Sequence, residues 1–117
     1  MTSPSLYETE THGDVFVIRF QNDSMLESSL IPKREAELKK MLDSAAASRI
    51  VVDLSNVEFM SSSALGLLVV LQKTAALQEK IFEICSPQPN IAEVLTITMF
   101  HKLFRIHDSL DVALAAE

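Results

Sequence analysis

The feature that most constrains the fold of this chain is an almost unbroken apolar run at residues 50–54, Ile-Val-Val-Asp-Leu. A strand with one face in water alternates apolar and polar residues, whereas a nearly continuous run is typical of a strand buried on both faces, and therefore of a central or parallel strand. After a polar loop, apolar residues recur at helical spacing from Leu65 to Ala76. Because parallel strands are joined by crossovers that usually contain a helix, this pair of elements predicts an α/β fold.

Shorter periodic runs on both sides extend this pattern. Two β-rich runs, at residues 6–10 and 15–20, flank turn residues at 11–14 and predict an antiparallel hairpin. We also expect a helix at 29–47 capped by Ser28 or Ser29, strands at 81–85 and 103–106, a short helix around 91–95, and a last helix that begins at Asp108. The predicted fold is an α/β domain: a mixed β-sheet with an opening antiparallel hairpin and then parallel βα units, packed with about four helices.

Length and composition fit one globular domain. The chain has 117 residues, the size of a single domain, and its 48% hydrophobic content is enough for a core that needs no disulfide. We expect residues 1–5 to form a flexible N-terminus and residues 6–117 to form the domain. The lone Cys85 cannot pair internally and offers no metal-binding spacing, so neither a metal nor a cofactor is predicted.

Charge and hydropathy argue against two classes of partner. The formal net charge is -6, the wrong sign for binding a nucleic-acid backbone. The longest apolar stretch, at residues 64–71, is far shorter than the roughly 20 residues of a membrane-spanning helix. The N-terminus also lacks a basic region followed by an apolar run, so we expect a cytoplasmic protein that binds neither nucleic acid nor membrane.

Three consecutive serines, Ser61 to Ser63, lie between the buried strand and the long helix. A serine at a helix start caps unpaired backbone N–H groups. A phosphate at the same place meets those same donors and the positive end of the helix dipole. From the residues alone, both a structural cap and a phosphate-bearing serine remain open.

The segment VVDLSNVEFMSSSALG at residues 51–66 carries a resemblance to a known family. It resembles the STAS-domain anti-sigma-factor antagonists, in which a strand ending in Asp-Leu-Ser is followed by an apolar-rich loop, by Asp-Ser-Ser or Asp-Ser-Ala, and by Gly-Leu-Gly at the start of a helix. The family's phosphorylated serine follows that aspartate, and the matching position is Ser62. The order of elements is similar over nearly the whole chain, which implies a single STAS domain, although only this segment is specific.

The resemblance implies a regulatory protein without enzymatic activity. Unmodified, such an antagonist binds an anti-sigma factor that is a serine kinase of the GHKL type, and it thereby releases a sigma factor for transcription. Phosphorylation of Ser62 by that kinase would end binding, because a phosphate adds about -1.5 to -2 charge to the interface. A PP2C-type phosphatase is the other implied partner.

The residues around the serines complete the expected site. Ser61 stands where the family usually has aspartate, and Ala64 stands where it has glycine. Ser61 and Ser63 are alternate phosphorylation sites. The family's second acidic residue, in a Gly-x-Leu-Asp stretch after the second strand, has its nearest match in Glu27. The expected partner-binding residues are Glu27, Asp53, Met60, Ser61, Ser63 and Ala64.

Some residues admit a second interpretation. Asp53 either orients the loop and contacts the partner or is a hydrogen-bonded strand end. Met60, beside the serines, is expected to be exposed and adaptable, whereas Met25, Met41, Met99 and Cys85 are expected to fill the core. The charged residues at 33–40 are interpreted as the solvated face of their helix.

Two alternatives concern the function itself. Ser62, His101, His107 and Asp108 raise the possibility of a serine hydrolase, but the segment lacks Gly-x-Ser-x-Gly and we interpret both histidines as surface or structural residues. The second alternative is a constitutive accessory subunit, similar to the small STAS subunits that bind the ATPase of lipid-transport ABC systems. In that protein the serines would be caps and contacts, and no phosphate would be needed.

Overall fold

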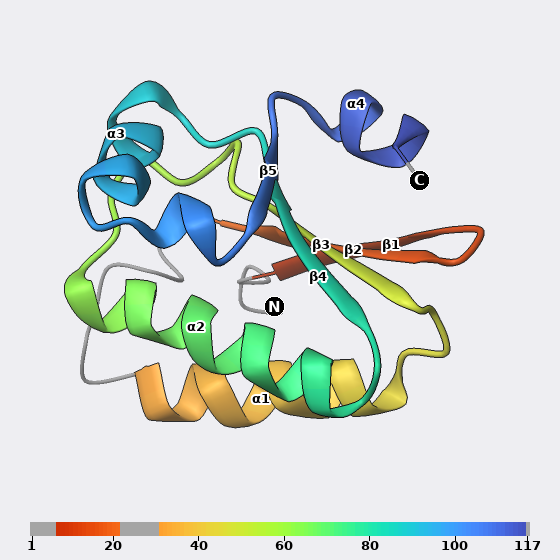
Figure 1. Cartoon of the computed structure of the whole chain (residues 1–117). Coiled ribbons are helices and arrows are strands. Elements are labelled where there is room, and N and C mark those ends of the chain that lie inside the picture. The colour runs from red at the N-terminus through yellow and green to blue at the C-terminus, as the bar shows by residue number, and fades with distance from the viewer. Residues whose placement is uncertain (1–6, 22–30, 117) are drawn as a thin grey trace, which may run out of the picture.

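The computed structural model describes residues 7–21 and 31–116 of the chain. Its five strands form one sheet in the order β1-β2-β3-β4-β5 (Figure 1). The elements are β1(Tyr7–His12), β2(Val15–Phe20), α1(Ile31–Ser44), β3(Arg49–Asp53), α2(Ser62–Leu77), β4(Ile81–Cys85), α3(Pro89–Ile97), the 3-10 helix η3(Phe100–Lys102), β5(Arg105–His107) and α4(Leu110–Ala115). β1 and β2 are antiparallel, and every later neighbouring pair is parallel. The predicted mixed α/β architecture, with β3 at its centre, is confirmed.

The opening hairpin has a tighter turn than expected. Thr11 pairs with Phe16 and His12 with Val15, so β1 runs two residues beyond the predicted end and only Gly13 and Asp14 form the turn. Gly13 has a φ of 60°, a backbone conformation that glycine adopts without a Cβ clash. A two-residue turn with glycine first matches the twist of a hairpin, which is why the strands continue to its edge.

Three other boundaries differ from the prediction. The fifth strand begins at Arg105, because Phe100 to Lys102 form a 3-10 turn first and Leu103 is half exposed in the connection. The cap of α4 is Ser109, whose side chain accepts a hydrogen bond from the Val112 N–H, rather than Asp108. α1 ends at Ser44, and the expected caps Ser28 and Ser29 lie outside the described residues.

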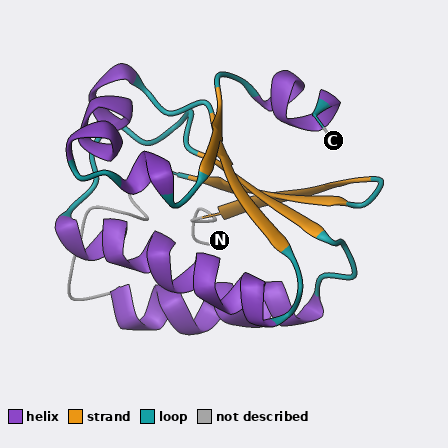
Figure 2. Cartoon of the chain, in the orientation of Figure 1, coloured by secondary structure: helices purple, strands orange, loops and turns teal. Residues whose placement is uncertain are grey.

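Apolar side chains fill both faces of the sheet, but unequally. The larger cluster joins α1, α2 and α3 to one face and includes fully buried Ile18, Val52 and Leu68. The smaller cluster lies on the other face, where Val17 and Val51 meet Ala113 of α4. α1 and α2 therefore cover one face, α3 adds Ile91 and Leu95 to the same cluster, and α4 lies over part of the opposite face (Figure 2). The face under α4 leaves room for the polar side chains described below.

A buried ion pair fastens α4 to the sheet. The Glu83 side chain on β4 is 1% exposed and accepts a hydrogen bond of 3.0 Å from the Nε of Arg49 on β3. The same guanidinium donates to the carbonyl oxygens of Ala113 and Ala116, at 2.9 and 3.0 Å. The C-cap residue of α4 is Ala116, and Arg49 adds side-chain hydrogen bonds to the carbonyl oxygens at this end of the helix.

Two histidines, the free cysteine, one methionine and one arginine can be compared with their expected positions. His107 is buried with its Nε2 3.2 Å from Glu83, and the Nδ1 of exposed His101 lies 3.4 Å from the Leu95 carbonyl oxygen. Cys85 is a buried free thiol, as expected, and burial raises its pKa to about 11. Two expectations are wrong: Met99 is half exposed instead of filling the core, and Arg34, on the helix at 33–40 that was expected to face solvent, is only 8% exposed.

Two absences apply to residues 7–21 and 31–116. No helix there is long and apolar enough to cross a membrane. Nor does that part of the chain bring together three or more His, Cys, Asp or Glu side chains that could hold a metal ion.

Candidate functional site: the serine loop and the start of α2

The three serines differ in structural role. Ser61 is the N-cap of α2: its backbone is extended, with φ of -75° and ψ of 166°, and its side chain accepts a hydrogen bond from the Ala64 N–H at 3.1 Å. The Ser61 carbonyl oxygen also accepts the Leu65 N–H at 3.1 Å. Among the three serines, capping therefore falls to Ser61.

Ser62 and Ser63 are the first two residues of α2, and both are exposed. Their position places two hydroxyl groups at the positive end of a 16-residue helix dipole. The first turn of α2 contains no acidic side chain that would oppose an added negative charge. The start of α2 therefore offers two accessible hydroxyls in surroundings that favour an anion.

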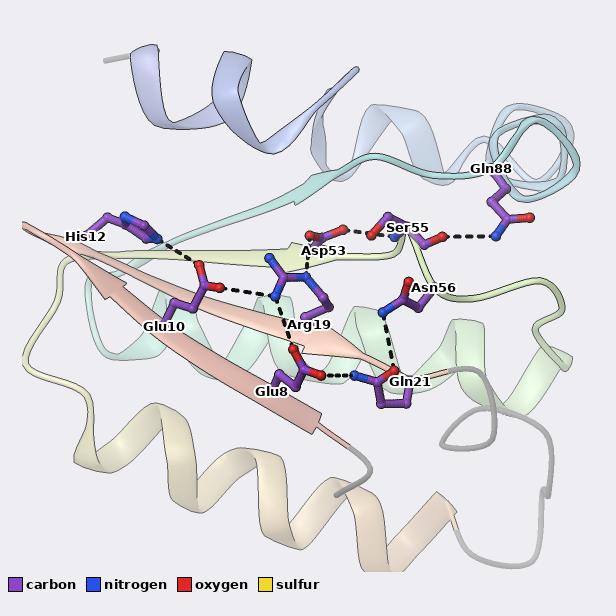
Figure 3. A network of polar contacts seen from close by, with 9 residues as sticks. All are labelled: Glu8, Glu10, His12, Arg19, Gln21, Asp53, Ser55, Asn56 and Gln88. Atoms are coloured by element: carbon purple, nitrogen blue, oxygen red, sulfur yellow. Dashed lines mark hydrogen bonds and ion pairs between the residues drawn. The ribbon is translucent and has the colours of Figure 1, made fainter. Parts of the chain in front are cut away.

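The segment between β3 and α2, residues 54–61, is here called the serine loop. It leaves the sheet through Asp53, whose Oδ1 accepts the Ser55 N–H at 2.9 Å. The other carboxylate oxygen of Asp53 accepts a hydrogen bond of 2.9 Å from the Nε of Arg19 on β2 (Figure 3). Asp53 is 3% exposed, so the guanidinium supplies the charge partner that a buried carboxylate requires.

Arg19 also connects this carboxylate to the edge strand β1. Its Nη1 donates to a carboxylate oxygen of Glu10 at 3.1 Å and to one of Glu8 at 3.3 Å (Figure 3). The hydrogen bond to Asp53, and after it the one to Glu10, raises the pKa of Arg19 further above its usual range. The sheet register explains the alignment, since Glu8 pairs with Arg19 and Arg19 pairs with Asp53 across three adjacent strands.

Amide side chains hold the serine loop at three further points. Asn56 donates to the side-chain oxygen of Gln21 at 3.2 Å. The segment after β4 supplies the other two contacts, because Gln88 donates to the Ser55 carbonyl oxygen at 3.0 Å and Asn90 to the Glu58 carbonyl oxygen at 2.7 Å. Contacts from β2, β3 and the start of α3 therefore fix the backbone that leads to Ser62.

Three of the expected partner-binding residues are buried. Ala64 is 0% exposed, Asp53 is 3% exposed and Met60 is 8% exposed. The expectation that Met60 would be exposed is wrong: like Val57, it belongs to the large core cluster, and both hold the loop against the sheet. Ser63 is exposed and Ser61 is half-buried, while Glu27 lies outside the described residues.

Sequence reasoning missed two residues of this site. Phe59, one position before Met60, is the exposed apolar side chain of the loop, with 56% of its surface accessible. Arg19 was missed as well, although a charged residue inside the apolar strand VFVIRF indicates a buried partner. Only the register between strands identifies that partner as Asp53.

The hydrolase alternative finds no support in this geometry. In the described part of the chain, Ser62 has no histidine partner, because His107 contacts Glu83 on the face that α4 covers and His101 contacts a backbone carbonyl. A hydrolytic serine needs a base within hydrogen-bond reach of its hydroxyl.

Comparison with known proteins agrees with this geometry. The family model of the STAS domain matches residues 7–113, and the chain therefore belongs to the STAS domain family. It is 36% identical over 58 residues to a STAS-domain containing protein of Pseudomonas aeruginosa, covering 50% of this chain and 57% of that protein. It is 29% identical over 82 residues to BtrV of Bordetella bronchiseptica, provisionally named an anti-sigma factor antagonist, covering 70% of each. The chain thus matches little more than half of the first of these relatives.

Solved structures give the same fold over longer stretches. An anti-sigma-factor antagonist domain protein of Planctomyces limnophilus superposes with a TM-score of 0.80 at 25% identity, covering 92% of this chain and 94% of that one. The anti-sigma factor antagonist SpoIIAA in its unphosphorylated form gives a TM-score of 0.74 at 16% identity, covering 92% of each chain. SpoIIAA of Bacillus in its phosphorylated form gives 0.67, also at 16% identity, covering 92% of this chain and 96% of that one.

Proposed function

We propose that this chain is an anti-sigma-factor antagonist whose binding to its partner is switched off by phosphorylation of Ser62. The observation that carries the proposal is that Ser61 and Ser62 have different structural roles. Ser61 uses its side-chain oxygen as the cap of α2, and Ser62, the next residue, is exposed at the helix start. A kinase can reach that hydroxyl without dismantling the cap.

A phosphate on Ser62 would act locally. It would bring about -1.5 to -2 charge at pH 7 to a helix start whose backbone donors and dipole favour an anion. The domain would therefore tolerate the modification, while a partner surface packed against this point would have to desolvate the new charge. Loss of binding without unfolding follows from this difference. SpoIIAA, which shares the fold, has solved structures in both forms, so the fold accommodates phosphate.

The surface offered to the partner combines polar and apolar groups. Ser62 and Ser63 are exposed at the helix start, and Phe59 is half exposed in the serine loop. Buried Asp53, Met60 and Ala64 support this surface from beneath rather than forming it, and Ser61 contributes through its cap. Glu27 is retained as the acidic contact that the resemblance implies.

In this proposal the partners are an anti-sigma factor that is a serine kinase of the GHKL type and a PP2C-type phosphatase. The chain itself performs no catalysis and acts in the cytoplasm, with neither nucleic acid nor membrane as a partner. The names of its relatives support the first partner, since BtrV and the Planctomyces protein both carry the description of anti-sigma-factor antagonists.

Phosphate mapping tests the proposal directly. Trypsin releases residues 50–73 as one peptide, which contains Ser55, Ser61, Ser62 and Ser63. In protein isolated from its own cells, we expect phosphate on Ser62 with an occupancy that changes between resting and stressed growth. Ser62→Ala should abolish that phosphate, and Ser62→Asp should weaken capture of the kinase at least tenfold, with Ser63→Ala as the matched control. Tight kinase capture by Ser62→Asp would contradict the switch.

One observation favours the second candidate, a constitutive subunit that binds the ATPase of a lipid-transport ABC system. Ser61 stands where the resemblance places an aspartate, and its role as the N-cap of α2 explains why a serine is present there without any phosphorylation. In this case no serine of the peptide 50–73 would carry phosphate under any growth condition, and Ser62→Asp would leave the co-purifying partner unchanged.

A further inference from the structure

Arg19 donates hydrogen bonds to three carboxylates, and none of these bonds goes directly to a serine. It lies on β2, three strands from the edge strand β5, with 19% of its side chain exposed. It donates to Asp53 at the end of β3 and to Glu8 and Glu10 on β1. A simple surface ion pair needs one carboxylate, whereas Arg19 binds three. We therefore ask which part of the structure these contacts hold in place.

That consequence follows from the position of Asp53. One of its oxygens faces Arg19 and the other holds the Ser55 N–H, so a single carboxylate connects the sheet to the first turn of the serine loop (Figure 3). Without Arg19, Asp53 would be an unpaired charge in a site that is 3% exposed. Such a group must protonate or turn toward water, and either change weakens its hold on Ser55.

We propose that Arg19 is a positioning residue for the serine loop: by holding the Asp53 carboxylate in place, it sets the backbone path that presents Ser62. The inference rests on the proposed function for its biological meaning, because it makes the ion pairs of Arg19 with β1 and β3 a determinant of how the backbone presents Ser62 to a kinase. β1 also contributes. Its Glu8 accepts hydrogen bonds from Arg19 and Gln21, and the side-chain oxygen of Gln21 accepts one from Asn56 of the serine loop.

The chain contains a matched control for this proposal. Arg49 on β3 forms a similar ion pair on the same sheet face, with 13% of its side chain exposed against the 1% exposed carboxylate of Glu83. Arg49 donates to Ala113 and Ala116 at the end of α4 and to Glu83, and among the described residues none of its hydrogen bonds goes to the serine loop. Loss of either arginine removes one buried ion pair, but each should loosen a different part of the molecule.

Amide hydrogen exchange in the full chain, measured by NMR without any partner, separates the two effects. In Arg19→Met we expect the Ser55 amide to exchange at least tenfold faster than in the wild type, with the α4 amides of Ala113 and Ala116 changed less than threefold. Arg49→Met should give the reverse pattern. Equal acceleration of loop and α4 in both variants, or an unchanged Ser55 amide in Arg19→Met, would overturn the proposal.

A conservative variant covers the case in which Arg19→Met does not fold. Arg19→Lys keeps one positive charge beside Asp53, so its Ser55 amide should exchange less than threefold faster than in the wild type. Cleavage by chymotrypsin after exposed Phe59 gives a second measure of loop opening, and it should be slow in wild type and Arg19→Lys and at least fivefold faster in Arg19→Met. Equally fast cleavage of the lysine and methionine variants would show that the charge does not hold the loop.

Neither measurement depends on phosphorylation, so this inference and the proposed function can fail separately. If Ser62 carries no phosphate in cells, the exchange data still decide the role of Arg19. If Ser62 is phosphorylated, its occupancy should fall at least threefold in Arg19→Met and stay within twofold of the wild type in Arg49→Met. An occupancy lowered equally by both variants would overturn the positioning role.

Discussion

The Ser61 hydroxyl oxygen accepts a hydrogen bond of 3.1 Å from the Ala64 backbone N–H, which closes the first turn of α2. Aspartate and serine are about equally good at this capping position. At the position where the resemblance implies an aspartate, Ser61 therefore provides the same capping geometry with one negative charge fewer beside Ser62. The departure from the family motif is conservative for structure and not for electrostatics.

Removal of this cap should have a measurable cost. Ser61→Ala is expected to lower the free energy of unfolding by about 1 kcal/mol, the typical loss for a serine cap. Ser61→Asp should keep or slightly raise stability, because it caps equally well and adds a favourable interaction with the helix dipole. Urea denaturation measures both, with Ser63→Ala as a control that should change stability by less than about 0.5 kcal/mol. A loss in Ser63→Ala as large as in Ser61→Ala would contradict the assignment of the cap.

The two glycines provide a second, opposed pair of predictions. Gly66 lies inside α2, and a Cβ added there meets nothing within 4 Å. Gly66→Ala should therefore raise stability by about 0.5–1 kcal/mol, because alanine restricts the unfolded chain and favours the helix. Gly13 also has open space, but its φ of +60° strains any other side chain, so Gly13→Ala should lower stability by about 1 kcal/mol. Thermal unfolding checks the opposite signs, and a change of the same sign in both would contradict the argument.

The start of α2 was predictable because its signals are local. A run of apolar residues, then serines, then helical periodicity mark the strand, the loop and the helix in order, and α2 begins at Ser62 as that pattern indicates. The choice of cap among three serines was not predictable, since it depends on which residue adopts extended backbone angles. The backbone before Ser61 is packed into the core through Val57 and Met60, and the local pattern does not reveal these contacts.

Contacts across the sheet lie beyond single-sequence reasoning. Arg19 and Asp53 are 34 residues apart and meet only because β2 and β3 are parallel in one particular register. Loops cause the other errors: Met60 is buried although neither helical nor strand periodicity applies to it, and Leu103 lies in an apolar run that reads as a strand but precedes β5. Periodicity therefore predicts helices and strands, whereas long-range packing decides which side chains of the connecting loops are buried.

Asp14 predicts a particular acid sensitivity. Hydrogen bonds from the Ser48 side chain and backbone N–H lower the pKa of this carboxyl below its ordinary value. A carboxyl whose pKa is lower in the folded state stabilises the fold above its unfolded pKa, and this contribution is lost as the pH falls through the folded pKa. Stability should therefore fall below about pH 4, and Asp14→Asn, which keeps an oxygen acceptor for Ser48, should flatten that part of the curve.

The measurement for Asp14 is urea denaturation at several pH values from 6 to 3 in the wild type and in Asp14→Asn. Asp43→Asn is the control, since Asp43 contacts Gln78 and is exposed on α1. The prediction requires a smaller stability change between pH 5 and pH 3 in Asp14→Asn than in the other two proteins. Parallel curves for all three would show that Asp14 contributes nothing to acid sensitivity.

Glu83 should be the most costly single charge to remove. Its side chain is 1% exposed, and its carboxylate contacts the side chains of Arg49 and His107. Glu83→Ala would therefore leave the largely buried guanidinium of Arg49 without its carboxylate. Loss of one partner of a buried pair costs about 3–5 kcal/mol, and the partial exposure of Arg49 favours the lower end, about 3 kcal/mol. Glu35→Ala, which breaks the partly exposed, solvent-accessible ion pair with Lys39 on α1, should cost less than about 0.5 kcal/mol. Urea denaturation of both variants at pH 7 decides the point, and a loss below about 1 kcal/mol in Glu83→Ala would mean that Arg49 finds enough compensation in the α4 carbonyls alone.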